Sequence, residues 1–127
     1  MQLPPYASDH PGRAAVDAMP GHVVIEFGVD WCPHCQRAAE PVAEALGAVG
    51  VPVAVGEGSV VAPGGLRYLR LEDQRMRPLG RSFKVKLWPT LLFLQDGVEV
   101  ARVVRPTKVA EVAAGIAALG LNKEVRP

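Results

Sequence analysis

Apolar runs alternate with polar segments along this chain and predict its strands. Residues 23–27 form a β-branched and aromatic run in which only Glu26 is polar, a pattern typical of a strand buried on both faces of a sheet. Residues 66–72 alternate leucines and Tyr68 with two arginines, which predicts a strand at or next to the centre of the sheet. The Val-rich residues 51–55 predict a short further strand.

A hairpin is predicted nearer the C-terminus. The apolar residues 91–94 and the Val-rich residues 98–104 lie on either side of Asp96-Gly97, and a glycine tolerates the positive φ that tight hairpin turns require. The two runs are therefore expected to pair as antiparallel strands.

Apolar residues at helical spacing predict the helices. One helix is expected over residues 32–47, bent by the internal Pro41. Another is expected to begin with Thr107 as its N-cap residue and to end before Gly120. Shorter helices are predicted within residues 13–19 and 79–83.

The order of these elements is strand, helix, strand, helix, hairpin and helix, which predicts an α/β fold. Its centre is a mixed sheet of four to five strands flanked by helices on both faces. We expect an N-terminal arm at residues 1–20, a core domain at 21–121 with a longer loop at about 51–65, and a C-terminal tail at 122–127. A chain of 127 residues can bury such a core without metals or structural disulfides.

Composition narrows the class of protein. Hydrophobic residues make up 49% of the chain and charged residues 21%, the balance of an ordinary globular protein. Because 14 basic residues face 13 acidic ones, the chain has no basic excess for binding nucleic acid. The first 20 residues carry prolines and charges and no apolar h-region, so we expect a cytoplasmic protein without a signal peptide or membrane anchor.

The two cysteines, Cys32 and Cys35, lie too close in sequence to cross-link a scaffold, so their role is local chemistry. A Cys-x-x-Cys pair where a strand passes into a helix is a redox motif. Cys32 is the predicted attacking thiolate, because unpaired amides and the dipole at a helix N-terminus favour negative charge. Cys35, one turn further along and more enclosed, is the predicted resolving thiol.

The two residues between the cysteines affect this chemistry. Pro33 suits the first helical turn, where no backbone donor is missed. A protonated His34 would favour the Cys32 thiolate and make the disulfide a stronger oxidant. We expect a reduction potential between about −270 mV, typical of a strong reductant, and about −120 mV, typical of a strong periplasmic oxidant.

A Cys-x-x-Cys pair is also half of a tetrahedral zinc site, which needs two further ligands. The histidines of the chain are His10, His22 and His34. His34 lies inside the pair, and the other two lie at unsuitable spacing. We therefore expect no metal and no cofactor other than the redox-active disulfide Cys32–Cys35.

Two further positions are candidate site residues. Glu26 stands within a buried run, where an ionised carboxylate is costly unless it is protonated or paired. It precedes Cys32 by six residues and is placed to exchange the proton of Cys35 through a water; the alternative is an edge position that points to solvent. Pro89 leads from a turn into a strand and is either a cis proline or an ordinary trans loop proline.

Together these segments resemble the thioredoxin family. The resemblance rests on residues 23–27, on Trp31-Cys32-Pro33-His34-Cys35, on residues 88–94 and on Asp96-Gly97, and it covers roughly residues 20–120. It implies a thioredoxin-like fold and a thiol-disulfide oxidoreductase. It also implies that Pro89 is cis and abuts the cysteine pair, with the Trp88 backbone pairing to an extended substrate.

The chain departs from the family's pattern near the expected site. Glu26 stands where the family usually carries Asp, and Pro33-His34 replaces Gly-Pro. Both changes bear on the redox potential. Arg105 is the nearest counterpart of a family glycine beside the substrate groove. The family's buried lysine has no clear match, with Tyr68 or Arg70 falling nearby.

Three functions are compatible with these features. The first is a thiol-disulfide oxidoreductase that reduces protein disulfides in the cytoplasm and is recycled by a reductase. The second is a binding or chaperone-like module that holds a partner with Trp31, Trp88 and Arg105, and the third is an oxidase or isomerase of an oxidising compartment. The cysteine pair, the proline and the carboxylate together favour catalysis. We expect a monomer without nucleic-acid or membrane partners, although the sequence gives no physical reason against a dimer.

Overall fold

The computed structural model describes residues 1–56, 61 and 64–121, and its centre is a five-stranded sheet in the order β2-β3-β1-β4-β5. The strands are β1 (His22–Gly28), β2 (Val53–Val55), β3 (Leu66–Glu72), β4 (Thr90–Gln95) and β5 (Val98–Val104). The helices are α1 (Arg13–Asp17), α2 (Pro33–Gly47), α3 (Pro78–Ser82) and α4 (Val109–Ala118). This architecture confirms the predicted α/β class with a mixed sheet.

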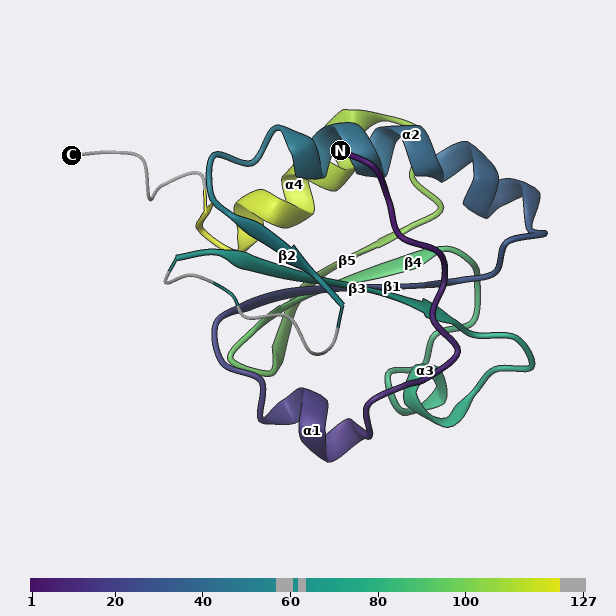
Figure 1. Cartoon of the computed structure of the whole chain (residues 1–127). Helices are drawn as coiled ribbons and strands as arrows, with labels where there is room; N and C mark the ends of the chain where they lie inside the picture. Colours follow the sequence, from purple (N-terminus) through teal and green to yellow (C-terminus); the bar gives the residue numbers. More distant parts are fainter. Residues whose placement is uncertain (57–60, 62–63, 122–127) are drawn as a thin grey trace.

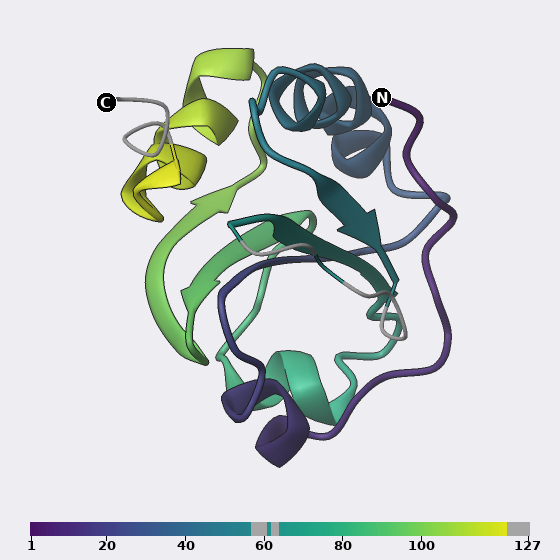
Figure 2. The same cartoon turned by 60° about the vertical axis from the view of Figure 1, so that its left-hand side comes forward.

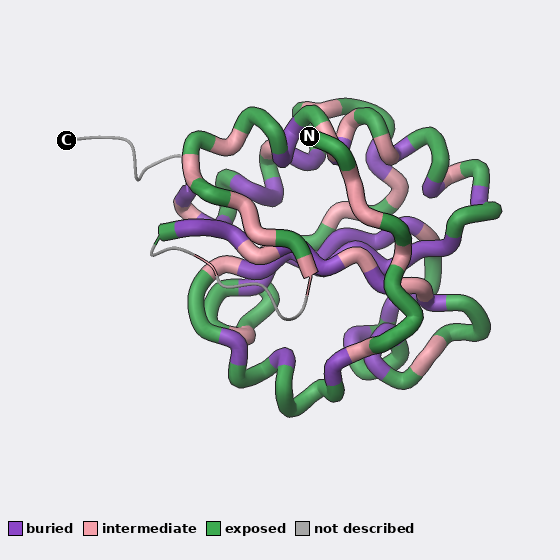
Figure 3. The backbone as a smooth tube through the Cα atoms, viewed as in Figure 1, coloured by how far each residue is buried: buried purple, intermediate pink, exposed green. Residues whose placement is uncertain are grey.

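Helices cover both faces of the sheet, with α2 and α4 on one face and α1 and α3 on the other (Figure 1). Successive strand residues point to opposite faces, so the central strand contributes to two cores. On β1, Val24 packs with residues of α2 and α4, while Ile25 and Phe27 pack with residues of α1 and α3. The inner strands β1, β3 and β4 are accordingly the most buried part of the backbone (Figure 3), which explains the continuous apolar run of β1.

The strand pairing brings three chain segments to one edge of the sheet. Strand β1 lies parallel to β3 and antiparallel to β4, so the ends of β1 and β3 meet the start of β4. Helix α2 begins at this edge, which is where open α/β sheets bind their ligands. At the opposite end of β4, Asp96 and Gly97 both adopt positive φ, as the predicted hairpin turn requires.

The N-terminal arm runs along one side of the sheet, from the α2 face to α1 (Figure 1 and Figure 2). Ala7 forms a parallel bridge with Leu71 of β3. Its N–H donates to the Arg70 carbonyl, and its own carbonyl accepts from the Glu72 N–H, both at 2.8 Å. Because β2 pairs with the first half of β3, the arm continues the sheet beside the second half.

One prediction on the helices is wrong. The N-cap residue of α4 is Lys108 and not Thr107. The Glu111 carboxylate accepts hydrogen bonds from the backbone N–H groups of both Thr107 and Lys108, each at 3.0 Å, so the N3 residue Glu111 closes a capping box on Lys108. Part of the loop predicted at 51–65, and the tail at 122–127, lie outside the described residues.

Candidate functional site

The cysteine pair lies where β1 passes into α2. Cys32 is the N-cap residue of the helix, Pro33 begins its first turn and Cys35 lies one turn inside. Both cysteines are free thiols. Cys32 keeps 6% of its surface exposed and Cys35 only 1%, so an incoming disulfide meets Cys32 first.

The loop before β4 packs against Cys32. The Trp88–Pro89 peptide bond is cis, the first of the two forms that the sequence left open. The Cys32 Sγ lies 4.0 Å from the Trp88 carbonyl oxygen. Arg105 donates from Nε to the same oxygen at 2.9 Å, and its backbone N–H donates to the Pro89 carbonyl at 2.8 Å. The structure therefore brings these four predicted site residues together.

Two tryptophans border the cysteine pair. Trp31 is 62% exposed and packs edge to face on Trp88, with 5.9 Å between ring centroids. The Trp88 indole N–H donates at 2.9 Å to Asp73, a fully buried carboxylate that also accepts the Arg77 backbone N–H. Sequence reasoning missed Asp73, because one aspartate after a strand does not reveal which side chain it meets.

His34 turns toward Arg37, whose Nη2 lies 2.9 Å from its Nδ1. Loss of solvation and then the positive charges of Arg105 and Arg37 lower the pKa of His34. The neutral imidazole is therefore favoured at neutral pH. This weakens the argument that a protonated His34 favours the Cys32 thiolate, and positive charge on this surface comes instead from the two arginines.

Glu26 is a fully buried carboxylate on β1 with donors on both of its oxygens. Tyr68 donates to Oε1 at 2.5 Å, and Tyr6 donates to Oε2 at 2.6 Å. Arg70 places its Nε 3.4 Å from Oε1. Such partners offset the cost of burying a charge. The solvent-facing alternative for Glu26 is thereby excluded, and both Tyr68 and Arg70 lie beside the carboxylate.

The buried cluster changes the acidity of its members. Burial, and then the charge of Glu26, raise the pKa of Tyr6 and of Tyr68 well above the usual value. Burial alone would lower the pKa of Arg70, but the Glu26 carboxylate and the two tyrosines raise it overall. Both hydroxyls therefore stay protonated, and the guanidinium stays charged, at neutral pH.

Tyr6 connects this cluster to Cys35. Its side chain packs against Val29, Cys32 and Cys35. A Cβ built on Gly28 would lie 2.6 Å from the Tyr6 Oη and 2.9 Å from the Cys35 Sγ, so both atoms crowd the same point and a side chain there would displace one of them. Burial is the largest cause that raises the pKa of Cys35 to about 11, and the nearby Tyr6 hydroxyl is among the smaller causes that lower it.

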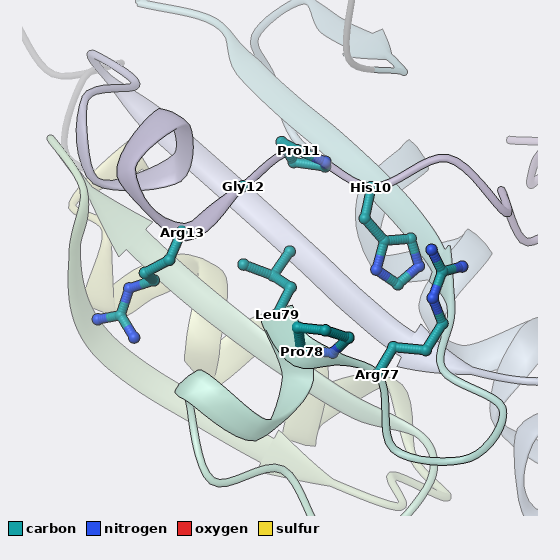
Figure 4. Close-up of a pocket in the computed structure, with 7 residues that line it drawn as sticks. All are labelled: His10, Pro11, Gly12, Arg13, Arg77, Pro78 and Leu79. Atoms are coloured by element: carbon teal, nitrogen blue, oxygen red, sulfur yellow. The ribbon is translucent and has the colours of Figure 1, made fainter.

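A separate pocket lies between the arm and the start of α3, lined by residues 10–13 and 77–79 (Figure 4). His10, one of the histidines weighed as a zinc ligand, places its Nε2 2.6 Å from the Glu72 carbonyl oxygen. Within residues 1–56, 61 and 64–121, no three His, Cys, Asp or Glu side chains are grouped so that they could hold a metal ion.

The sequence and the structure of this chain are both similar to those of known thioredoxins. The thioredoxin family model matches residues 12–118. A thioredoxin of Chlamydia pneumoniae is 32% identical over 84 residues, which span 66% of this chain and 69% of that protein. Thioredoxin H5 of Arabidopsis thaliana is 28% identical over 86 residues, 68% of this chain and 61% of that protein. The structure of reduced thioredoxin 2 from Pseudomonas aeruginosa PAO1 matches with a TM-score of 0.73 and 38% identity, covering 94% of this chain and 97% of that one. The chain belongs to the thioredoxin family.

As a thioredoxin, the chain is a thiol-disulfide oxidoreductase with two cysteines in the family's Cys-x-x-Cys arrangement. Family members act on protein disulfides together with a reductase and need no cofactor. In the described part of this thioredoxin, no helix has the length and apolar character to cross a membrane.

Two residues of the site carried only weak signals in the sequence. Tyr6 is the one Phe, Trp or Tyr among the first 20 residues, and an isolated aromatic in a proline-rich arm is usually unremarked. Gly28 ends the buried strand β1, which is also an ordinary place for glycine. The contacts of Tyr6 with Gly28 and Cys35 depend on the pairing of the N-terminal arm with β3, which the sequence does not reveal.

Proposed function

We propose that this thioredoxin reduces disulfides of protein substrates through a Cys32/Cys35 dithiol-disulfide couple. The Cys32 thiolate attacks one sulfur of the substrate disulfide, which forms a mixed disulfide and releases the first substrate thiol. Cys35 then attacks the Cys32 sulfur, which closes the Cys32–Cys35 disulfide and releases the second thiol. A reductase returns two electrons and restores the dithiol.

The observation that carries this proposal is the placement of the two sulfurs. Cys32 caps α2 and lies 4.0 Å from the Trp88 carbonyl, while Cys35 is enclosed one turn deeper. A helix N-terminus favours a thiolate, and an enclosed thiol reacts only with a disulfide already brought to it. The order of attack follows from this difference.

Trp31, Trp88, Pro89 and Arg105 form the proposed substrate-binding surface. The backbone around the cis Pro89 lies beside Cys32, where an extended substrate segment can pair as a short added strand. Trp31 offers an exposed apolar face next to it. Arg105 adds positive charge and holds the Trp88 carbonyl in place.

Three side chains assist the cysteines in this scheme. Pro33 fixes the first turn of α2, and neutral His34 lines the surface beside Arg37 and Arg105. Glu26 is the base that accepts the proton of Cys35. We further propose that the protein is a cytoplasmic monomer, without nucleic-acid or membrane partners, and that the disulfide Cys32–Cys35 is its only redox group.

Insulin reduction by dithiothreitol, followed by turbidity, tests the proposal. The wild type is expected to accelerate precipitation, and Cys32→Ser to abolish that acceleration. Cys35→Ser keeps the attacking thiol but cannot close the internal disulfide, so mass spectrometry is expected to find it linked to an insulin chain through Cys32. Full acceleration by Cys32→Ser would overturn the proposed order of attack.

A further inference from the structure

We propose that Tyr6, on the N-terminal arm, is a catalytic residue that relays the proton of the Cys35 thiol to the Glu26 carboxylate. The sequence suggested a water in this role, whereas the structure places the Tyr6 hydroxyl between the two groups. The inference rests on the proposed function, because a relay has a task only if Cys35 is the resolving thiol.

The hydrogen bonds of Tyr6 have the polarity that a relay requires. Its hydroxyl has one hydrogen, which it donates to the Glu26 Oε2 at 2.6 Å. The lone pairs of the same oxygen stay free to accept the S–H of Cys35. The Tyr6 Oη and the Cys35 Sγ both lie within 2.9 Å of the position where a Gly28 Cβ would be. The thiol and the hydroxyl are therefore neighbours, and the hydroxyl is hydrogen-bonded to the carboxylate.

Several contacts hold the Tyr6 ring in this place. The bridge between Ala7 and Leu71 fixes the backbone one residue further along. Arg70 donates from Nη1 to the Pro4 carbonyl at 2.9 Å and lays its guanidinium over the Tyr6 ring, 3.9 Å from the ring centroid. The arm is thus anchored on both sides of Tyr6, so the hydroxyl is pre-positioned.

The relay moves one proton from Cys35 to Glu26 while the disulfide to the substrate is exchanged for the Cys32–Cys35 disulfide. In the mixed disulfide, the Cys35 S–H proton passes to the Tyr6 oxygen as the Tyr6 hydroxyl proton passes to Glu26. The Cys35 sulfur attacks the Cys32 sulfur, the Cys32–Cys35 bond forms, and the bond from Cys32 to the substrate sulfur breaks. The substrate leaves as a thiolate and is reduced, while the cysteine pair is oxidised. Glu26 holds the proton until reduction of the pair reverses the transfer.

The acidity of Cys35 explains why a relay is useful. With a pKa of about 11, only about one Cys35 in ten thousand is a thiolate at pH 7. The titratable and charged groups that face this chain are Cys32 at the start of α2, Glu26 on β1, Tyr68 and Arg70 on β3, and Asp30, which lines one pocket together with Tyr6 and Cys35. Among these groups, Glu26 is the carboxylate that Tyr6 reaches.

Two releases of thionitrobenzoate from 5,5′-dithiobis(2-nitrobenzoate) separate the two steps. Cys32 attacks first and releases one equivalent, and Cys35 then resolves the mixed disulfide and releases the second. Stopped-flow absorbance of wild type, Tyr6→Phe and Tyr68→Phe gives both rates from pH 6 to 9. Tyr6→Phe keeps the ring under Arg70. Tyr68→Phe is the matched control, because it removes a hydroxyl from the other oxygen of the same carboxylate.

Tyr6→Phe is expected to slow the second release about tenfold or more at pH 7, less than the full effect of about a hundredfold for general acid-base catalysis because a water can enter beside Cys35. Its first release is expected to stay near the wild-type rate. Without the relay, the second rate depends on thiolate formed in bulk water and rises about tenfold per pH unit. The wild type and Tyr68→Phe are expected to show a shallower slope.

Each contrary result has a distinct meaning. A wild type that releases one equivalent only would contradict the proposed couple itself. A wild type with two releases, together with a Tyr6→Phe rate and pH slope like those of the wild type, would overturn the relay alone. An equal loss and equal slope in Tyr6→Phe and Tyr68→Phe would also overturn it, because the effect would then act through the carboxylate and not through the Tyr6 hydroxyl.

Discussion

Cys35 is expected to titrate as an unusually weak acid. The Cys32→Ser variant leaves Cys35 as the single thiol, since the chain has two cysteines. Burial is the largest cause that raises the pKa of Cys35 to about 11, and the neighbouring Cys32 is a smaller one. Because burial persists in the variant, the pKa should stay well above the value of about 8.5 for a free thiol.

The raised pKa of Cys35 determines the titration curve that is expected for its thiolate. With a pKa near 11, less than about 1% of Cys35 is a thiolate at pH 8.5, where a free thiol is half ionised. Thiolate absorbance at 240 nm, measured from pH 6 to 11, reports this directly, with the double variant Cys32→Ser/Cys35→Ser as the background. The two tyrosines interfere little, because both have raised pKa values. A midpoint below about pH 9.5 would refute the claim that burial controls this thiol.

Three other substitutions probe the site. Tyr68→Phe removes the 2.5 Å hydrogen bond to buried Glu26 and should lower the free energy of unfolding in urea by about 1.5–3 kcal/mol; a loss below about 0.5 kcal/mol would contradict this. Gly28→Ala places a Cβ 2.6 Å from the Tyr6 Oη and should cost about 1–3 kcal/mol, so an unchanged melting temperature would count against the crowding. Arg105→Gln removes both the charge and the hydrogen bond to the Trp88 carbonyl, and it should reduce kcat/KM for an acidic peptide disulfide about two- to fivefold more than for a neutral one; equal losses for both would argue against a charge effect.

The strands, the helices and the cysteine pair of this thioredoxin were predictable because each is encoded by the residue pattern of its own segment. The apolar run of β1 and the helical spacing after Cys32 each report burial of their own segment. Glu26 could be recognised as a buried carboxylate for the same reason, since it interrupts an otherwise apolar strand. The Cys-x-x-Cys spacing likewise defines the pair without knowledge of the rest of the fold.

The partners of Glu26 were not predictable, because they depend on register and on the path of the arm. Arg70 stands opposite Glu26 only through the parallel pairing of β1 with β3. Tyr6 reaches the carboxylate because Ala7 joins β3 beyond the end of β2. The wrong N-cap has a similar origin, since the reach of the Glu111 side chain decides where α4 begins.

The most direct test of the central claim is a redox titration of Cys32 and Cys35 in glutathione buffers, followed by tryptophan fluorescence with Trp31 beside the pair. The account predicts one reversible two-electron transition with a potential between about −270 and −120 mV. It also predicts that Cys35→Ser removes this transition. A wild type without a reversible two-electron couple would contradict the proposal that the pair carries the activity.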